Sequence, residues 1–411
     1  MSRGSLLDFD DTDEEAAFRK TARDWLAANG PAKGWFASLP TDAEKLQAAR
    51  DWQRTKFEGG FACITWPKEV GGGGGTSIQQ VIYNQEEAKY DVPRGYFDVT
   101  FGMCLPTLMK VLGADATKRF IGPALLGEEA WCQLFSEPSA GSDLAGLRMR
   151  AVQTGNTWMV NGQKVWTSGA HFADYGLLLV RTSPEKPKHR GLTMFWVDMR
   201  SLGIKVQPIK QMSGRSMFNE VWFDDVEVND NQRIGEVDDG WRMSLVTLMN
   251  ERLSIGGGSG PTYRDAMKTA AEITGLDGRP ASEDRAFREK IAEWYIASKG
   301  VELTGFRTLT ALSRGETPGP ESSISKLVSA NTAQAVALEM MDVQGEWGGV
   351  RDAEESVANA VYQMSMMMSP GGRLAGGTDE VLRNIVAERV LGLPGDIRVD
   401  KTVPFNKIPT S

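Results

Sequence analysis

Apolar positions recur every three to four residues along the first third of the chain. Residues 12–27 begin with Thr12 and Glu15, which have the spacing of a capping box, and then place apolar residues on one helical face. The same periodicity continues over residues 42–56 and 78–90, with a glycine-rich loop between them. We therefore expect the first 129 residues (1–129) to form a helical domain.

The pattern changes to short, strand-like apolar runs after about residue 130. Residues 158–160 and the pair Val165 and Trp166 flank Asn161-Gly162, a dipeptide typical of hairpin turns. Several further short runs follow without helical patterns between them, which predicts a mostly antiparallel β domain over residues 130–239. No G-x-G-x-x-G motif follows a strand, so a Rossmann-type dinucleotide site is disfavoured.

Helical periodicity returns from residue 240 and continues to the end of the chain. Glycine- and proline-containing breaks divide this part into about five helices, so residues 240–411 are expected to form a C-terminal helical bundle. The order helical, β, helical predicts an α+β fold of three domains.

Composition narrows the classes of function. The 411 residues are 41% hydrophobic and 24% charged, as in ordinary globular enzymes, and the net charge of −8 leaves no basic stripe for nucleic acid or anionic lipid. Three cysteines and two histidines lack metal-ligand spacing, so we expect no metal site and a reducing compartment. Without an apolar signal region or an apolar stretch of about 18 residues, we expect a cytoplasmic protein that does not span a membrane.

Three segments rich in small and hydroxylated residues point to a known family. Residues 135–143 read FSEPSAGSD, residues 161–169 read NGQKVWTSG, and residues 376–380 read GGTDE. Taken singly, the first could be a plain turn and the second could contribute only a core tryptophan. In this order and separation, however, they resemble the signature, flavin-ring and C-terminal segments of the FAD-dependent acyl-CoA dehydrogenases.

The resemblance implies a site for FAD. Glycine- and serine-rich turns let backbone N–H groups approach a flavin edge and a diphosphate, and a tryptophan face can cover the isoalloxazine ring and exclude water. The FAD contacts that the resemblance implies are Phe135, Ser136, Gly141, Ser142, Trp166, Ser168, Gly345, Thr378 and Glu380. Ser142 is also implied as a contact of the acyl-CoA substrate.

The same resemblance identifies a catalytic base. Such enzymes need one carboxylate beside the thioester, and many members carry it where this chain has Gly376. Long-chain and isovaleryl-type members instead use a glutamate on a helix after the β domain, where this chain has Asn250-Glu251-Arg252. We therefore predict Glu251 as the α-proton base, with Asn250 and Arg252 as substrate contacts. The Gly376 N–H is predicted to donate to the thioester oxygen, together with a flavin ribityl hydroxyl.

The resemblance thus implies FAD-dependent α,β-dehydrogenation of an acyl-CoA in fatty acid metabolism. It also implies a homo-oligomer, a tetramer or dimer, and an electron-transfer flavoprotein as acceptor.

An oxygen-reducing flavoenzyme of the same fold, such as an acyl-CoA oxidase or a monooxygenase, is the first alternative. A non-catalytic subunit of a hetero-oligomeric dehydrogenase is the second, because this chain departs from the family at two positions that contact a neighbour's flavin. Arg279 is out of register with the usual arginine, and Asp342 replaces the usual glutamine.

Overall fold

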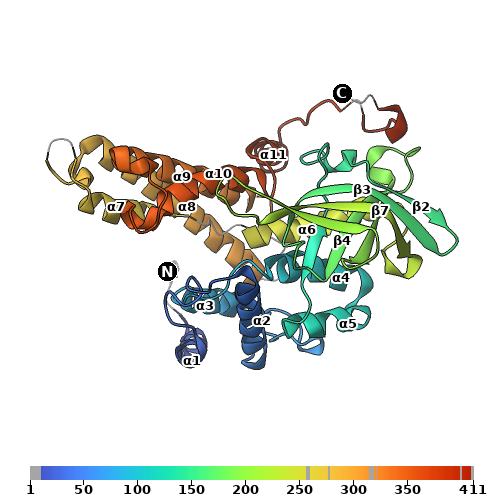
Figure 1. The fold of residues 1–411 in the computed structure, drawn as a ribbon, viewed down its shortest axis with the longest axis horizontal. Coiled ribbons are helices and arrows are strands. Elements are labelled where there is room, and N and C mark those ends of the chain that lie inside the picture. The colour runs from blue at the N-terminus through green and yellow to red at the C-terminus, as the bar shows by residue number, and fades with distance from the viewer. Residues whose placement is uncertain are drawn as a thin grey trace, which may run out of the picture.

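The computed structural model describes residues 11–255, 260–275, 278–313, 319–320, 322–398 and 400–408. N-terminal helices pack below a central sheet, and the C-terminal helices extend away from it along the longest axis of the molecule (Figure 1). The α+β fold with the order helical, β, helical is as the sequence predicts.

Helix capping sets the boundaries in the N-terminal part. The Thr12 hydroxyl accepts from the Glu15 N–H, and the Glu15 carboxylate accepts from the Thr12 N–H at 2.8 Å, which completes the predicted capping box. Thr41 and Thr76 cap the next two helices in the same way. The helices are α1 (Asp13–Asn29), α2 (Asp42–Glu58), α3 (Ser77–Glu87), α4 (Leu105–Leu112) and α5 (Ala114–Leu125), with a π-helical turn, η2 (Thr100–Cys104), before α4.

The central sheet has the strand order β6-β7-β3-β2-β4-β5-β8, and β1 pairs with β4. The strands are β1 (Trp131–Leu134), β2 (Arg150–Thr154), β3 (Thr157–Ser168), β4 (Tyr175–Arg181), β5 (Leu192–Asp198), β6 (Ile204–Ile209), β7 (Phe218–Asn229) and β8 (Arg233–Ile234). Strand β4 pairs in parallel with β1 and, through a single residue pair, with β2. All other ladders between these strands are antiparallel, as predicted.

The predicted hairpin turn at Asn161-Gly162 is wrong. Strand β3 runs through both residues, and the turn that joins β2 to β3 lies at residues 155–156. Asn161 exchanges two hydrogen bonds with Asp225 on β7, at 2.9 and 3.0 Å, where the β3–β7 register shifts in a bulge. Gly162 has φ 142°, and a Cβ there would lie 3.0 Å from the Cα of Met149. The dipeptide therefore provides a bulge and a close backbone approach rather than a turn.

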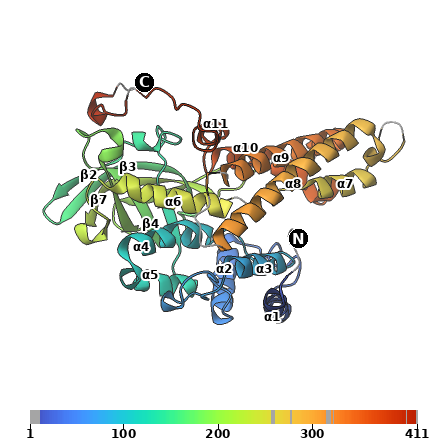
Figure 2. The ribbon, with the colours of Figure 1, turned by 180° about the vertical axis from the view of Figure 1, so that it is seen from behind.

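Helix α6 links the sheet to the C-terminal bundle. It packs against β5, α4 and η2 on one side and against α9 on the other, and both views show it between the two parts (Figures 1 and 2). The described residues form six α-helices here rather than the five expected: α6 (Gly240–Ile255), α7 (Tyr263–Glu272), α8 (Arg285–Ser313), α9 (Ser322–Val343), α10 (Val361–Leu374) and α11 (Asp379–Ile385). None of the helices in the described ranges is long and apolar enough to cross a bilayer.

After α11 the chain returns to the sheet, and residues 400–408 dock there (Figure 1). The Phe405 N–H donates to the Lys186 carbonyl at 2.8 Å. The guanidinium carbon of the buried Arg181 lies 3.7 Å from the centroid of the Phe405 ring. Lys188 forms ion pairs with Asp400 in this tail and, at 2.9 Å, with Asp143. The tail is thereby attached to the end of the predicted flavin-binding turn.

Candidate active site

Glu251 lies where the sheet, α6 and the C-terminal bundle meet. One turn earlier on α6, Thr247 is fully buried, and its hydroxyl lies 3.0 Å from that of Thr107 on α4, so the helix is fixed in place. The half-buried Glu251 carboxylate accepts a hydrogen bond from the Gln133 amide on β1 at 3.4 Å. Gln133 is two residues before Phe135, so the predicted base reaches the start of the predicted flavin segment.

Lys326 on α9 contacts the C-terminal glycine segment. Its ammonium, in a side chain that is 7% exposed, donates to the Gly377 carbonyl at 2.7 Å and to the Arg373 carbonyl at 3.0 Å. Burial lowers the pKa of Lys326, and the negative charge of Glu251 is one of those that oppose this effect. Gly376 and Gly377 adopt φ values of 66° and 101°, which a residue with a Cβ rarely adopts. Lys326 thus fixes the backbone on both sides of Gly376.

A threonine cap and hydrogen-bonded carboxylates stabilise the first turn of α11. Thr378 caps the helix by accepting from the Val381 N–H at 3.3 Å. Burial alone would raise the pKa of Asp379, but hydrogen bonds from Arg373 and Asn331 outweigh it and lower that pKa. The pKa of the exposed Glu380 is lowered by its own backbone N–H at the helix start and by Thr378. A cavity of about 230 Å³ is lined by Gln334, Pro370, Arg373, Leu374, Asp379 and Glu380.

A buried ion pair shapes the turn over residues 135–143. The Glu137 carboxylate accepts from the Lys164 ammonium at 2.8 Å and from the N–H groups of Arg148 and Met149 at 2.6 and 3.0 Å. Lys164 is fully buried, and burial lowers its pKa although Glu137 opposes the shift. The neighbouring Val165 N–H donates to the Ser136 carbonyl at 2.9 Å, so this turn lies directly beside Trp166. Sequence reasoning missed Glu137 and Lys164, although two opposite charges inside the two family-like segments were a usable signal.

The residues around Trp166 fit a flavin ring. Trp166 is 59% exposed, has a φ of 58°, and its ring contacts Phe218 only edge-on, at a centroid distance of 6.1 Å. Ser168, two positions further along the same strand, is exposed as well. A Cβ added at the exposed Gly141 would meet no atom within 4 Å. A flat aromatic face beside small and hydroxylated residues is the surface that an isoalloxazine ring would cover.

Not every predicted contact residue lies near Glu251 and Trp166 within one chain. Gly345 lies just past the far end of α9, and the stretch of this helix from Lys326 to Val343 alone corresponds to roughly 25 Å. Its contact with a flavin stays a prediction that needs a second chain. Asn250 is half-buried beside Glu251, whereas the side chain of Arg252 lies outside the described residues. Within the described ranges, no cluster of three His, Cys, Asp or Glu side chains could hold a metal ion.

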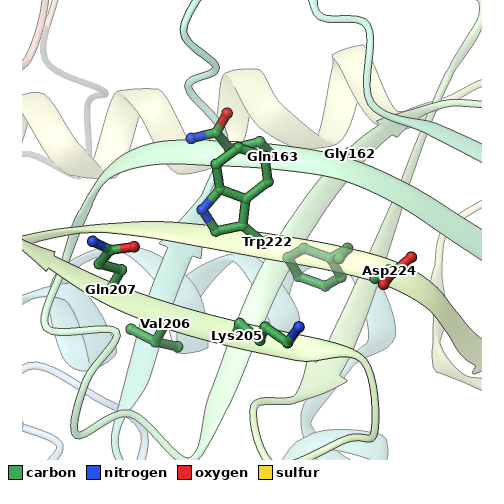
Figure 3. Close-up of a pocket in the computed structure, with 8 residues that line it drawn as sticks. Gly162, Gln163, Lys205, Val206, Gln207, Trp222 and Asp224 are labelled. Atoms are coloured by element: carbon green, nitrogen blue, oxygen red, sulfur yellow. The ribbon is translucent and has the colours of Figure 1, made fainter.

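One hollow lies on the sheet and contains none of the predicted site residues. It is open, has a volume of about 720 Å³, and is lined by residues of β3, β6 and β7 (Figure 3). Its lining residues are Gly162, Gln163, Lys205, Val206, Gln207, Trp222, Phe223 and Asp224. The residues predicted to carry the chemistry, Glu251 and Trp166, are not among the residues that line this hollow.

Comparison with known proteins agrees with this arrangement. Three models described as the N-terminal, middle and C-terminal domains of acyl-CoA dehydrogenase match residues 12–129, 132–226 and 238–391. The chain is 32% identical to the acyl-CoA dehydrogenase IpdE1 of Mycolicibacterium smegmatis, over 94% of this chain and 99% of that protein. It is 35% identical to FadE34 of Mycobacterium tuberculosis over 87% of its own length, but it spans only 47% of that protein.

One chain of a solved complex has a similar structure. The ChsE4-ChsE5 complex from Mycobacterium tuberculosis contains a chain that matches with a TM-score of 0.77 and 26% identity. The match covers 95% of this chain and all of that one. The helical, β, helical arrangement is thus shared over nearly the whole length.

Proposed function

We propose that this chain, which belongs to the acyl-CoA dehydrogenase family, uses Glu251 to take the α proton of an acyl-CoA thioester. Members of this family are oxidoreductases that act on CH–CH bonds, and the chain is an enzyme of this class. The observation that carries the proposal is the position of Glu251: it is half-buried, accepts a hydrogen bond from Gln133 on β1, and lies on α6, which packs against both the sheet and α9.

Each part of the site has one task in the proposed reaction. Glu251 accepts the α proton, the β hydrogen leaves as a hydride, and a carbon–carbon double bond forms between the two carbons. When bound, FAD supplies the hydride acceptor. The Gly376 N–H donates to the thioester oxygen and stabilises the negative charge that develops there. Trp166 covers the ring and excludes water, while Ser136, Ser142 and Ser168 supply hydroxyl groups around it.

The test is Glu251→Gln, which keeps the shape of the side chain but cannot accept a proton. We expect the rate of anaerobic flavin bleaching by a good acyl-CoA to fall by about 10²–10⁴-fold, with acyl-CoA binding and FAD content near those of the wild type. Glu236→Gln is the matched control, since that glutamate is exposed and precedes α6. Adding Gly376→Glu to Glu251→Gln offers a carboxylate from the other family position and should restore part of the rate. Bleaching by Glu251→Gln at the wild-type rate would place the base elsewhere.

A second candidate is that the chain works as one subunit of a hetero-oligomer. It is supported by the likeness to a chain of the ChsE4-ChsE5 complex and by the departures at Arg279 and Asp342. The measurement is FAD per chain after the chain is purified alone. One FAD per chain in a homotetramer or dimer supports the homo-oligomer, whereas flavin that is retained only after a partner subunit is added supports the second candidate.

The acceptor and the acyl group complete the proposal. We assign electron-transfer flavoprotein as the acceptor, because a closed and dry site slows reaction with oxygen while product is bound. Stoichiometric hydrogen peroxide during turnover would instead identify an oxygen-reducing enzyme of the same fold. A panel of acyl-CoAs from short and straight to branched and polycyclic, with flavin bleaching as the readout, identifies the acyl group.

A further inference from the structure

The C-terminal tail, residues 400–408, docks on the turn between β4 and β5. The Phe405 N–H donates to the Lys186 carbonyl at 2.8 Å, and the Asn406 N–H donates to the Pro184 carbonyl at 2.9 Å. Backbone hydrogen bonds of this kind fix the register of an added segment, as they do for a peptide that extends a sheet. The tail therefore lies on the turn in one defined position.

The ring of Phe405 covers a buried cation. The guanidinium carbon of Arg181, which is 2% exposed, lies 3.7 Å from the centroid of this ring. The Arg181 guanidinium donates to the carbonyls of Ala145, Leu147 and Lys188 at 2.6, 3.2 and 2.7 Å. These carbonyls carry no net charge, so the electron-rich face of the ring adds to the stabilisation of the cation. Arg181 thus links the segment around Ala145 to the turn on which the tail lies, and Phe405 packs on this link.

The ammonium of Lys188 forms a second link between the same segments. It donates to the two carboxylate oxygens of Asp143 at 3.0 and 2.9 Å and forms an ion pair with Asp400 in the tail. Burial alone would lower the pKa of Lys188, but the hydrogen bonds to Asp400 and Asp143 outweigh it and raise that pKa. One largely buried ammonium is therefore shared by a carboxylate of the tail and a carboxylate of the predicted flavin-binding turn.

Asp143 lies at the end of the turn that carries a predicted FAD contact. Ser142, which is exposed, directly precedes it. The Asp143 carbonyl accepts from the Gly146 N–H at 2.8 Å, and this hydrogen bond closes the short helical turn η3 (Leu144–Gly146). Contacts that hold Asp143 and the residues after it therefore fix the position of Ser142.

The turn between β4 and β5 is also attached to α6, on its other side. The His189 ring packs edge-on against Trp241 in the first turn of α6, at a centroid distance of 4.8 Å. The Thr182 hydroxyl donates at 2.9 Å to Asp238, which precedes this helix. These contacts do not involve the tail. Release of the tail should therefore loosen the side of the turn that faces Asp143, without unfolding the turn.

We propose that docking of the C-terminal tail is coupled to FAD binding, because the tail stabilises through Arg181 and Lys188 the turn that the cofactor contacts. The inference rests on the proposed FAD site and goes beyond it, since it assigns part of the affinity for FAD to Phe405 and Asp400. These are positioning residues, because they act through the two cations. Coupling between two binding events is reciprocal, so bound FAD must favour the docked tail by the same factor by which the docked tail favours FAD.

The test measures both directions of this coupling in the full-length protein, in the assembly that retains FAD. The first measurement is the rate at which trypsin cuts after the exposed Arg398, followed by mass spectrometry of the released C-terminal peptide. A protease must bind several residues on each side of the bond, and the residues from Asp400 onward are held on the turn. We expect cutting with FAD bound to be about tenfold slower than after FAD has been removed.

The second measurement is the FAD dissociation constant of variants in the tail, by fluorescence titration. Phe405→Ala and Asp400→Asn should each raise it by about tenfold and remove most of the protection that FAD gives to Arg398. Phe405→Tyr keeps an aromatic face over Arg181 and should retain both properties. Lys407→Ala is the matched control, since this exposed residue lies in the same tail and should change neither quantity.

Two results would overturn the proposal. One is equal cutting after Arg398 with and without FAD, and the other is a Phe405→Ala variant that releases its tail but keeps the wild-type FAD dissociation constant. A tail with a merely structural role would give the second result, with a lower unfolding temperature of the FAD-free protein. A protein that binds no FAD in any assembly would overturn the proposed FAD site and this coupling together. Undiminished bleaching by Glu251→Gln would instead count against the proposed base alone.

Discussion

Breaking the buried pair between Glu137 and Lys164 should be costly, and the two single variants should differ. Lys164→Met leaves the Glu137 carboxylate, only 6% exposed, with the N–H groups of Arg148 and Met149 as donors. Glu137→Leu leaves a fully buried ammonium with the Phe135 carbonyl as its remaining partner in the structure. The second variant should therefore be the more damaging one.

The size of the expected loss in unfolding free energy follows from the burial of the ion pair. Removing one partner of a buried ion pair typically costs about 3–5 kcal/mol, because the other charge stays uncompensated. In Lys164→Met two backbone N–H groups still donate to the remaining carboxylate, so we expect a loss of stability near the lower end of this range. In Glu137→Leu the remaining ammonium keeps one carbonyl partner, so we expect a loss near the upper end. Because burial already lowers the pKa of Lys164, its deprotonation at high pH limits the loss in Glu137→Leu. The double variant leaves no unpaired buried charge, so its loss of unfolding free energy should be clearly smaller than the sum of the two single losses.

The assay is urea unfolding followed by tryptophan fluorescence, together with FAD release during the transition. Lys299→Met is the matched control, because it breaks an exposed pair with Glu302 and should cost about 0.5 kcal/mol or less. FAD should be lost before global unfolding in both single variants, since Glu137 holds the turn that carries Ser142. Single variants that each cost under about 1 kcal/mol, or effects that simply add, would refute the reasoning.

Two further predictions concern exposed parts of the site. Trp166→Ala should weaken FAD retention while changing the stability of the protein without flavin by about 0.5 kcal/mol or less, because the ring is 59% exposed; equal FAD dissociation constants by fluorescence titration would remove Trp166 from the site. Phe405→Ala should release the C-terminal tail, at a cost of about 2 kcal/mol for a cation–π contact with the buried Arg181. Limited proteolysis should then cut after residue 391 faster than in the wild type, and equal cutting rates would show that the contact does not hold the tail.

The order of the domains and the type of most elements could be predicted from local pattern. A capping threonine needs only a partner three residues away, so Thr12 placed the start of α1 correctly. The failure at Asn161-Gly162 has the opposite cause. That dipeptide permits both a turn and a bulge, and the choice depends on Asp225, 64 residues later on β7. Local sequence does not contain that neighbour.

The amino-acid sequence by itself determined which side chains were available for chemistry: one glutamate beside an arginine after the β domain, a glycine where relatives keep a carboxylate, and a tryptophan within a serine-rich segment. Only the tertiary structure decided which of them meet. Gln133 and Glu251 meet because α6 packs against the sheet, and Lys326 meets Gly377 because α9 packs beside the segment before α11. The same packing leaves Gly345 at the far end of α9. Helix periodicity specifies the face on which a residue lies, whereas contacts between distant segments depend on how those faces are buried against each other.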